Sequence, residues 1–157
     1  MSADSSVAWL LCVGAERRVA TAMHEVIQIL PIPKIVPVPS APAHCRLTTL
    51  WEDKVVPVME LNVLLAGQPP QPPSNYHYVG VVAWQDQPRN PLQYGGLLLT
   101  EPPWQHWVHD NQMCEPADER ALWRQVCWCC VSHENGIVPI LNIQRLFTTS
   151  GHLLTAN

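Results

Sequence analysis

The stretch that decides the fold is KVVPVMELNVLL at residues 54–65, because the same pattern returns as GIVPILNIQRLF at residues 136–147. Apolar residues occupy matching positions in the two copies, and their prolines align. A turn signal precedes each copy, and Asn135-Gly136 is the stronger one because both residue types tolerate the positive φ of a tight hairpin turn. The shared proline and the shared flanks argue against a chance likeness of two valine-rich strands, so the repeat predicts two similar small β lobes.

Turn residues divide the rest of the chain into further short apolar runs, which are typical of β-strands. Sixteen prolines support an all-β interpretation, because proline breaks helix interiors. Outside the repeat we expect strands at 7–13, 17–22, 34–39, 47–51, 76–84, 92–100 and 122–131. The first two should form a hairpin across Gly14, and 34–39, which holds two prolines, should be an edge strand or an extended loop.

Several segments are predicted to depart from strand structure. Residues 23–30 carry apolar side chains at spacings of three and four, which predicts one or two helical turns that end at Pro31. Short helical turns are also expected at the ends of the two repeat copies. Residues 104–118 are polar and predicted to be irregular, with a helical turn over 116–125. The two tryptophans at 104 and 107 fit lobe packing and partner contact equally well.

The segment QPPQPPS at residues 68–74 has the composition of an extended polyproline spacer. We therefore expect a single domain over residues 1–150, divided by this spacer. Its parts are lobe one at about 7–67, the spacer at 68–75, lobe two at about 76–148, and beyond them a tail at 149–157. A ligand segment for an SH3 or WW domain is the alternative interpretation of the spacer.

The charge balance excludes several classes of partner. The net charge is −4, and Arg17-Arg18 is the only basic pair. Nucleic-acid binding and basic membrane binding both require clustered positive charge, so we expect no nucleic acid and no direct membrane insertion. The apolar run 7–15 is too short to span a bilayer, and residues 1–6 lack the positive charge of a secretory signal. We expect a cytoplasmic protein whose six cysteines are thiols.

The sharpest metal-like group is Cys127, Cys129 and Cys130 with His133. On a regular strand Cys127 and Cys129 share one face while Cys130 points to the other, and no second cysteine pair completes a zinc site. We therefore interpret these thiols as structural and expect no metal, with a Cys/His metal-binding protein as the alternative. The sequence shows no glycine-rich phosphate loop and no nucleophile elbow, so we also expect no catalysis and no cofactor.

Three stretches, in order along the chain, resemble the CheW-like domain family. Residues 17–26 end in MHEV and are similar to the family's strand that leads into a V-x-E-V turn. Residues 29–42, ILPIPKIVPVPSAP, are similar to its i-x-p-v-P-x-a-P segment. The repeated VVPVMEL is similar to its G-x-v-v-P-v-i-D-L strand. Together these stretches cover nearly the whole chain.

This resemblance implies two five-stranded SH3-like β-barrels packed side by side, with short helical turns. It also implies a non-catalytic adaptor that couples a CheA-type histidine kinase to chemoreceptors. One barrel surface would contact the regulatory SH3-like domain of the kinase, and another would contact the cytoplasmic tip of the receptor. The implied partner contacts are Glu25, Val26, Glu52, Asp53, Val56 and Val58. Burial in the core is the alternative for the last two.

The chain departs from the family pattern at the first hairpin turn. Family members have Arg-Gly where this chain has Glu52-Asp53, which reverses the charge of the turn. The usual Gly that opens the strand corresponds to Leu47, and the usual Asp corresponds to Glu60 and Asn142 in the two copies. By analogy these differences are typical of accessory members in pilus-linked chemosensory systems that control twitching motility. A degenerate member that binds another partner is the alternative.

Overall fold

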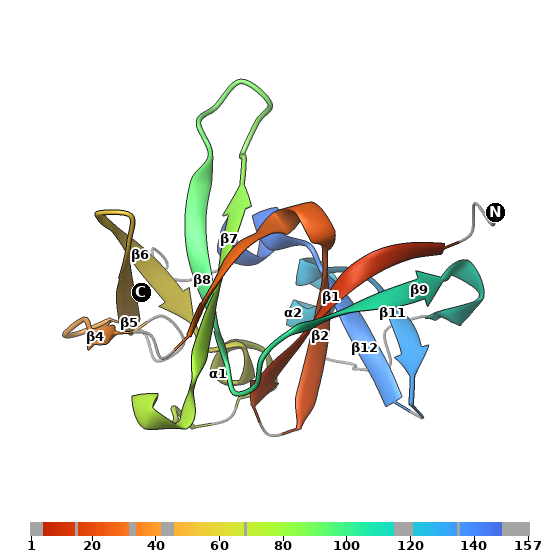
Figure 1. Cartoon of the computed structure of the whole chain (residues 1–157), viewed down its shortest axis with the longest axis horizontal. Helices are drawn as coiled ribbons and strands as arrows, with labels where there is room; N and C mark the ends of the chain where they lie inside the picture. Colours follow the sequence, from red (N-terminus) through yellow and green to blue (C-terminus); the bar gives the residue numbers. More distant parts are fainter. Residues whose placement is uncertain are drawn as a thin grey trace.

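The computed structural model describes residues 5–14, 16–31, 34–41, 46–67, 69–114, 121–134 and 136–148. These residues form twelve strands in two six-stranded sheets, with a few short helices between them (Figure 1). The chain is therefore mostly strand, as the repeat and the prolines predicted. The expected turn residue Asn135, part of the helical turn expected at 116–125, and the tail 149–157 lie outside the described residues.

The strands and helices have the following bounds. Sheet A contains, in order across the sheet, β10 (Met113–Cys114), β11 (Cys127–His133), β12 (Gly136–Leu141), β2 (Arg17–Ala22), β1 (Ser5–Gly14) and β9 (Trp104–His109). Sheet B contains β3 (Val26–Pro31), β7 (Tyr78–Trp84), β8 (Gln93–Leu99), β6 (Lys54–Met59), β5 (Leu47–Trp51) and β4 (Ile35–Pro37). The helical segments are η1 (Met23–Glu25), α1 (Leu61–Ala66), η3 (Pro73–Asn75), η4 (Asp110–Gln112), α2 (Ala121–Val126) and residues 143–148.

Both sheets are built in the same way. Each has one parallel contact, between β12 and β2 in sheet A and between β6 and β8 in sheet B. The two end strands of each sheet follow one another in the chain, β9 and β10 in sheet A and β3 and β4 in sheet B. The segment β9–β10 therefore pairs with both β1 and β11, and the segment β3–β4 pairs with both β7 and β5. A continuous segment at both ends of a sheet curls the sheet, so each sheet forms a small barrel. The expected pair of SH3-like barrels is confirmed, with six strands rather than five in each sheet.

The two halves of the chain exchange hairpins. Hairpin β1–β2 pairs with β9 and β12 of the second half, and hairpin β7–β8 pairs with β3 and β6 of the first half (Figure 1). The sheets therefore do not divide at the spacer into lobes 7–67 and 76–148, and that expectation is corrected. Hairpins have local sequence signals, whereas the pairing of Ala20 with Ile140 joins two distant strands for which the sequence holds no such signal.

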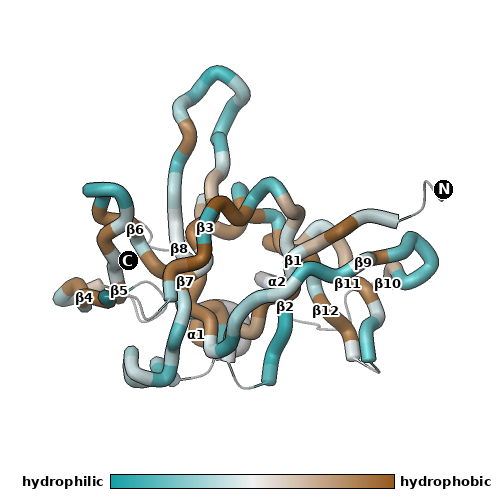
Figure 2. Tube along the Cα trace, viewed as in Figure 1, coloured by the Kyte–Doolittle hydropathy of each residue, from teal (hydrophilic) through white to brown (hydrophobic). Residues whose placement is uncertain are grey.

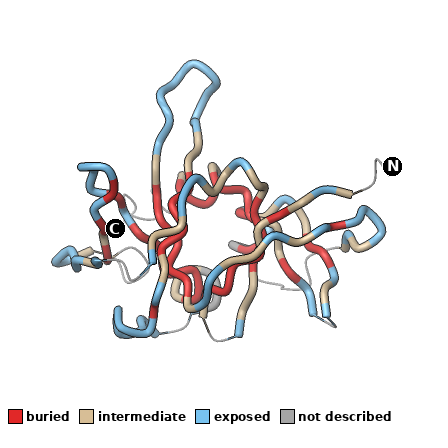
Figure 3. Tube along the Cα trace, in the orientation of Figure 1, coloured by how far each residue is buried: buried red, intermediate tan, exposed pale blue. Residues whose placement is uncertain are grey.

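The largest core lies between the barrels, because it contains side chains from both sheets. The buried stretches of the chain gather around the middle of the molecule (Figure 3). Its fully buried members include Leu11, Met59, Leu97 and Leu141. Each barrel also has a smaller core of its own. By contrast, the loop between β7 and β8 is hydrophilic and projects away from the rest of the molecule (Figure 2). The shared core fixes the two barrels against each other.

Three local expectations were wrong. Residues 122–126, expected within a strand over 122–131, belong to helix α2, where a helical turn over 116–125 was also expected, and the strand β11 begins only at Cys127. Residues 23–30 form a helical turn only at Met23–Glu25, and the remainder belongs to β3, which pairs with β7. Residues 104–109, expected to be irregular, form β9 against β1. At 23–30 and 104–109 the pairing with a distant strand overrides the local pattern.

The helix at residues 143–148 packs on sheet B although it directly follows β12 of sheet A. The ring of Phe147 stacks on Trp84 of β7, with ring centroids 4.4 Å apart and an interplanar angle of 13°. Gly95 of β8 lies under the same ring, because a Cβ built there would be 2.3 Å from Phe147. This helix therefore contributes to holding the two barrels together.

We expect Gly95→Ala to lower the free energy of unfolding by about 1–3 kcal/mol, because the added methyl group overpacks a ring that Trp84 holds in place. The matched control is Gly80→Ala, whose Cβ would meet Leu99 at an ordinary 3.6 Å. Urea unfolding of the two variants measures the difference. Equal stabilities would contradict this account of the contact.

Candidate interaction surfaces

Strands β4, β5 and β6 present an apolar outer face to solvent. Leu50 and Val55 lie opposite each other on β5 and β6, with 62% and 73% of their surfaces exposed. Val36 of β4 is 49% exposed and pairs with Thr48, which pairs in turn with Pro57. We call these five residues the hairpin face. Contiguous exposed apolar side chains are typical of protein–protein contact sites.

The expected contact residues Val56 and Val58 do not belong to this face. Both side chains are buried in the core of the sheet B barrel, with 2% and 0% of their surfaces exposed. Side chains alternate along a strand, so β6 turns these two inward and turns Val55 and Pro57 outward. The expectation of partner contact is therefore wrong for these two side chains, and core burial, its alternative, is confirmed.

The tip of the β5–β6 hairpin is acidic. Glu52 and Asp53 are exposed, and both have a positive φ, 48° and 64°, as a tight hairpin turn requires. The ammonium group of Lys54 lies 4.5 Å from the ring centroid of Tyr94 and 5.4 Å from that of Trp51. Trp51 points inward, so Lys54 lies on the opposite side of the hairpin from Val55. Two carboxylates therefore dominate the tip beside the hairpin face.

A second candidate surface is a groove beside η1. It consists of two hollows of about 420 Å³ and 280 Å³ that share His24, Glu25 and Trp128 in their walls. The first hollow is lined further by Met23 and Asp110, among others, and the second by residues of β7 and of the loop after it. We call this surface the Trp128 groove. It adjoins both sheets, because β11 belongs to sheet A and β7 to sheet B.

Trp128 projects because β11 has a bulge at this residue. Cys127 pairs with Leu141 and Cys129 pairs with Ile140, so Trp128 is an extra residue on its strand. The side chain of Trp128 is 70% exposed. The bulge also corrects the expectation that Cys127 and Cys129 share a face, because their partners on β12 are adjacent residues, which point to opposite faces.

Within the described part of the chain, no group of three His, Cys, Asp or Glu residues is placed to hold a metal ion. Cys130 is buried, whereas Cys129 and His133 are half-buried. Burial raises the pKa of the Cys129 thiol, and the neighbouring Cys114 raises it further. A raised pKa disfavours the thiolate that metals bind. The absence of metal at Cys127, Cys129, Cys130 and His133 stays a prediction.

Of the expected contact residues, Glu25 lines both hollows of the groove, and Val26 follows it in the chain without lining either. Glu25 accepts a hydrogen bond from the backbone N–H of Ala22 at 3.1 Å and another from the backbone of Ile143. Burial raises the pKa of the Glu25 carboxyl, although these donors act in the opposite direction. Val26 packs half-buried against the core between the sheets. Glu25 thus ties η1 to the last helix in addition to lining the groove.

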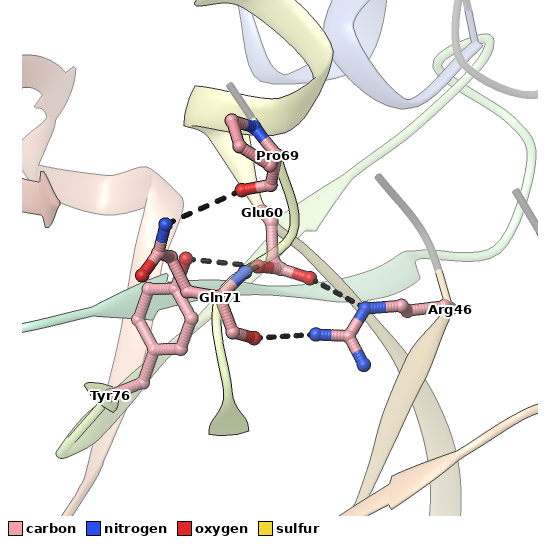
Figure 4. A network of polar contacts seen from close by, with 5 residues as sticks. All are labelled: Arg46, Glu60, Pro69, Gln71 and Tyr76. Atoms are coloured by element: carbon pink, nitrogen blue, oxygen red, sulfur yellow. Dashed lines mark hydrogen bonds and ion pairs between the residues drawn. The ribbon is translucent and has the colours of Figure 1, made fainter. Parts of the chain in front are cut away.

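A buried polar network anchors the spacer to sheet B (Figure 4). Glu60 is 1% exposed and forms an ion pair with Arg46, whose Nε lies 3.1 Å from Oε1. Its other oxygen, Oε2, accepts hydrogen bonds from the hydroxyl of Tyr76 at 3.0 Å and from the backbone N–H of Gln71 at 3.3 Å. Arg46 also donates to the backbone oxygen of Gln71 at 2.6 Å. Glu60 is therefore a structural residue and not a contact site.

A comparison with protein families decides the class of this chain. The family model of the CheW-like domain matches residues 8–151. The chain belongs to the CheW-like domain family. Members are non-catalytic scaffolds of chemosensory signalling, so this CheW-like chain is a scaffold and not an enzyme.

Among solved structures, the CheW-like chain is similar to the crystal structure of the scaffolding protein TtCheW from Thermoanaerobacter tengcongensis. The TM-score is 0.65 at 13% sequence identity, and the match covers 86% of this chain and 88% of that one. At this identity the similarity shows a shared fold. No curated protein sequence matches the chain. Among its described residues, no helix has the length and apolar character needed to cross a bilayer.

Sequence reasoning missed the most exposed residues of both surfaces. The exposure of Leu50 and Val55 follows from strand alternation once the residues of β5 and β6 that face the core are known. The projection of Trp128 depends on the bulge, which has no clear signal in the sequence. Of the two tryptophans considered for contact, Trp104 is half-buried beneath the guanidinium of Arg18, and Trp107 is 59% exposed on β9.

Proposed function

We propose that this chain is a cytoplasmic adaptor that couples a CheA-type histidine kinase to chemoreceptors by binding alone. The observation that carries the proposal is a pair of exposed surfaces, the hairpin face and the Trp128 groove, that have no residue in common. An adaptor requires two such surfaces, because both partners must bind at the same time. Membership of the CheW-like family supports this assignment.

The hairpin face is the proposed contact for the regulatory SH3-like domain of the kinase. Its outward residues lie on three adjacent strands, and a second small barrel can pack on such an apolar sheet face. Glu52 and Asp53 stand at its edge. Leu50 and Val55 are the proposed centre of this contact, because they are the most exposed apolar residues of the face.

The Trp128 groove is the proposed contact for the cytoplasmic tip of the receptor. A hollow with apolar walls suits an amphipathic helix, whose apolar side chains insert into it. Met23, Val108 and Ile140 line the larger hollow, and Trp128 stands between the two hollows. Because the groove adjoins both barrels, a bound receptor segment would contact both of them.

Two single substitutions should separate these contacts. Val55→Asp is expected to weaken binding of the kinase regulatory domain by about tenfold or more and to leave receptor binding unchanged. Trp128→Ser should show the reverse pattern. Calorimetric titration of both variants against both partners from the same genome measures this, with the exposed Trp107→Ser as the matched control. Wild-type affinity of both variants for both partners would contradict the proposal.

The setting that we propose is a chemosensory system that controls twitching motility through type IV pili. The support is the departure from Arg-Gly at Glu52-Asp53, which is typical of a divergent accessory member. Twitching zones of a deletion strain, complemented with wild type or with Val55→Asp, test this setting. Normal twitching in the deletion strain would contradict it.

A further inference from the structure

The hairpin face combines an apolar centre with charge of one sign at its tip. Leu50 and Val55 form the centre, and the exposed carboxylates of Glu52 and Asp53 follow directly in the turn between them. Lys54 lies over aromatic rings on the other side of the hairpin. A partner that packs on Leu50 and Val55 therefore meets two negative charges at the turn.

The other basic side chains near this hairpin do not neutralise the tip. The guanidinium of Arg46 binds Glu60 and the backbone of Gln71. Lys34 is exposed just before β4, and because Ile35 pairs with Thr49 it comes level with Leu50, beside the hairpin face and not in the turn. The ion pairs of the described residues do not include Lys34. The negative charge is thus concentrated at Glu52 and Asp53.

We propose that the partner of the hairpin face is an apolar surface with a Lys or Arg side chain opposite Glu52 and Asp53. This inference rests on the proposed function and specifies the kinase domain that the face accepts. A charged tip beside an apolar contact selects partners by charge, because like charges across an interface are strongly unfavourable. The kinase of this chain then differs at that point from the kinase of a family member with Arg-Gly.

The test replaces Glu52 and Asp53 by the Arg-Gly pair of other family members. Glu52→Arg with Asp53→Gly should weaken binding to the chain's own kinase regulatory domain by about tenfold or more. The same double variant should strengthen binding to a kinase regulatory domain whose own adaptor carries Arg-Gly. Both changes should be larger at low salt, because exposed charges are screened by ions. Titrations of wild type and variant against both kinase domains, at two ionic strengths, give the four comparisons.

The control is Asp86→Arg, which raises the net charge by two, against three for the double variant, but lies in the exposed loop after β7. It should change none of the affinities. If Val55→Asp weakens binding while the tip exchange has no effect, the charge proposal is overturned and the hairpin face stands. If neither changes binding, the assignment of the kinase to this face fails as well.

Discussion

Trp123→Ala is expected to lower the free energy of unfolding by about 3–5 kcal/mol. Trp123 lies on α2 with 2% of its surface exposed, within the core that both sheets share. Its ring also lies 5.1 Å from the guanidinium carbon of Arg17. The substitution removes the largest fully buried side chain among the described residues and leaves a cavity between the barrels. Because that core belongs to both sheets, the variant should still unfold in a single transition.

The matched control is Trp128→Ala, which removes the same side chain from an exposed position. It should change the stability by no more than about 0.5 kcal/mol. Urea unfolding monitored by circular dichroism, which reports on all strands, gives both values. A loss below about 1 kcal/mol for Trp123→Ala would contradict the shared core, and so would two separate transitions, one for each barrel.

Glu60→Ala should destabilise the chain by about 3 kcal/mol, the lower end of the range for breaking a buried ion pair. The substitution leaves Arg46, whose side chain is 25% exposed, without its carboxylate, and removes the acceptor for Tyr76. Partial exposure allows water to reach the guanidinium, which limits the loss. Urea unfolding should give a lower midpoint at an unchanged slope, because the folded barrels remain.

Tyr76→Phe is the control for this network, because it removes one hydrogen bond and keeps the ring in the sheet B core. We expect a loss of about 1 kcal/mol. Glu60→Gln should fall between the two, since its amide keeps an acceptor but not the charge. If Glu60→Ala is no less stable than Tyr76→Phe, the ion pair with Arg46 contributes nothing to stability.

The sequence predicted the features of the fold that depend on neighbouring residues. Both hairpins of the repeat, β5–β6 and β11–β12, follow from a turn signal between two apolar runs. The second turn begins one residue earlier than Asn135-Gly136, because Glu134 has the positive φ and Gly136 already pairs with His133 in β12. The helical turns after the two hairpins also lie where the pattern places them. The exchange of β1–β2 and β7–β8 between the halves was not predicted, because it depends on strand pairs that are distant in sequence. For the same reason, β9 was mistaken for an irregular segment.

The candidate surfaces were predicted only in part. Exposure of Glu52 and Asp53 follows from the turn, since charged residues at a hairpin tip have no partner within the fold. Val56 and Val58 were assigned to contact by resemblance, whereas the alternation of β6 places them inside the barrel. Trp128 projects because β11 has one extra residue at the bulge. A sequence pattern that assumes strict alternation of inward and outward side chains does not predict such a bulge.

The exchange of hairpins determines when each barrel can form during synthesis. Hairpin β1–β2 leaves the ribosome first, but β9, its neighbour in sheet A, begins about eighty residues later, and β12 comes later still. At roughly 5–20 residues per second, the N-terminal hairpin waits several seconds with an unpaired edge. Sheet B is complete once β8 has emerged, so it should close first and sheet A last. A chaperone that binds nascent chains would have its main opportunity during that interval, at the hydrophobic strand β1.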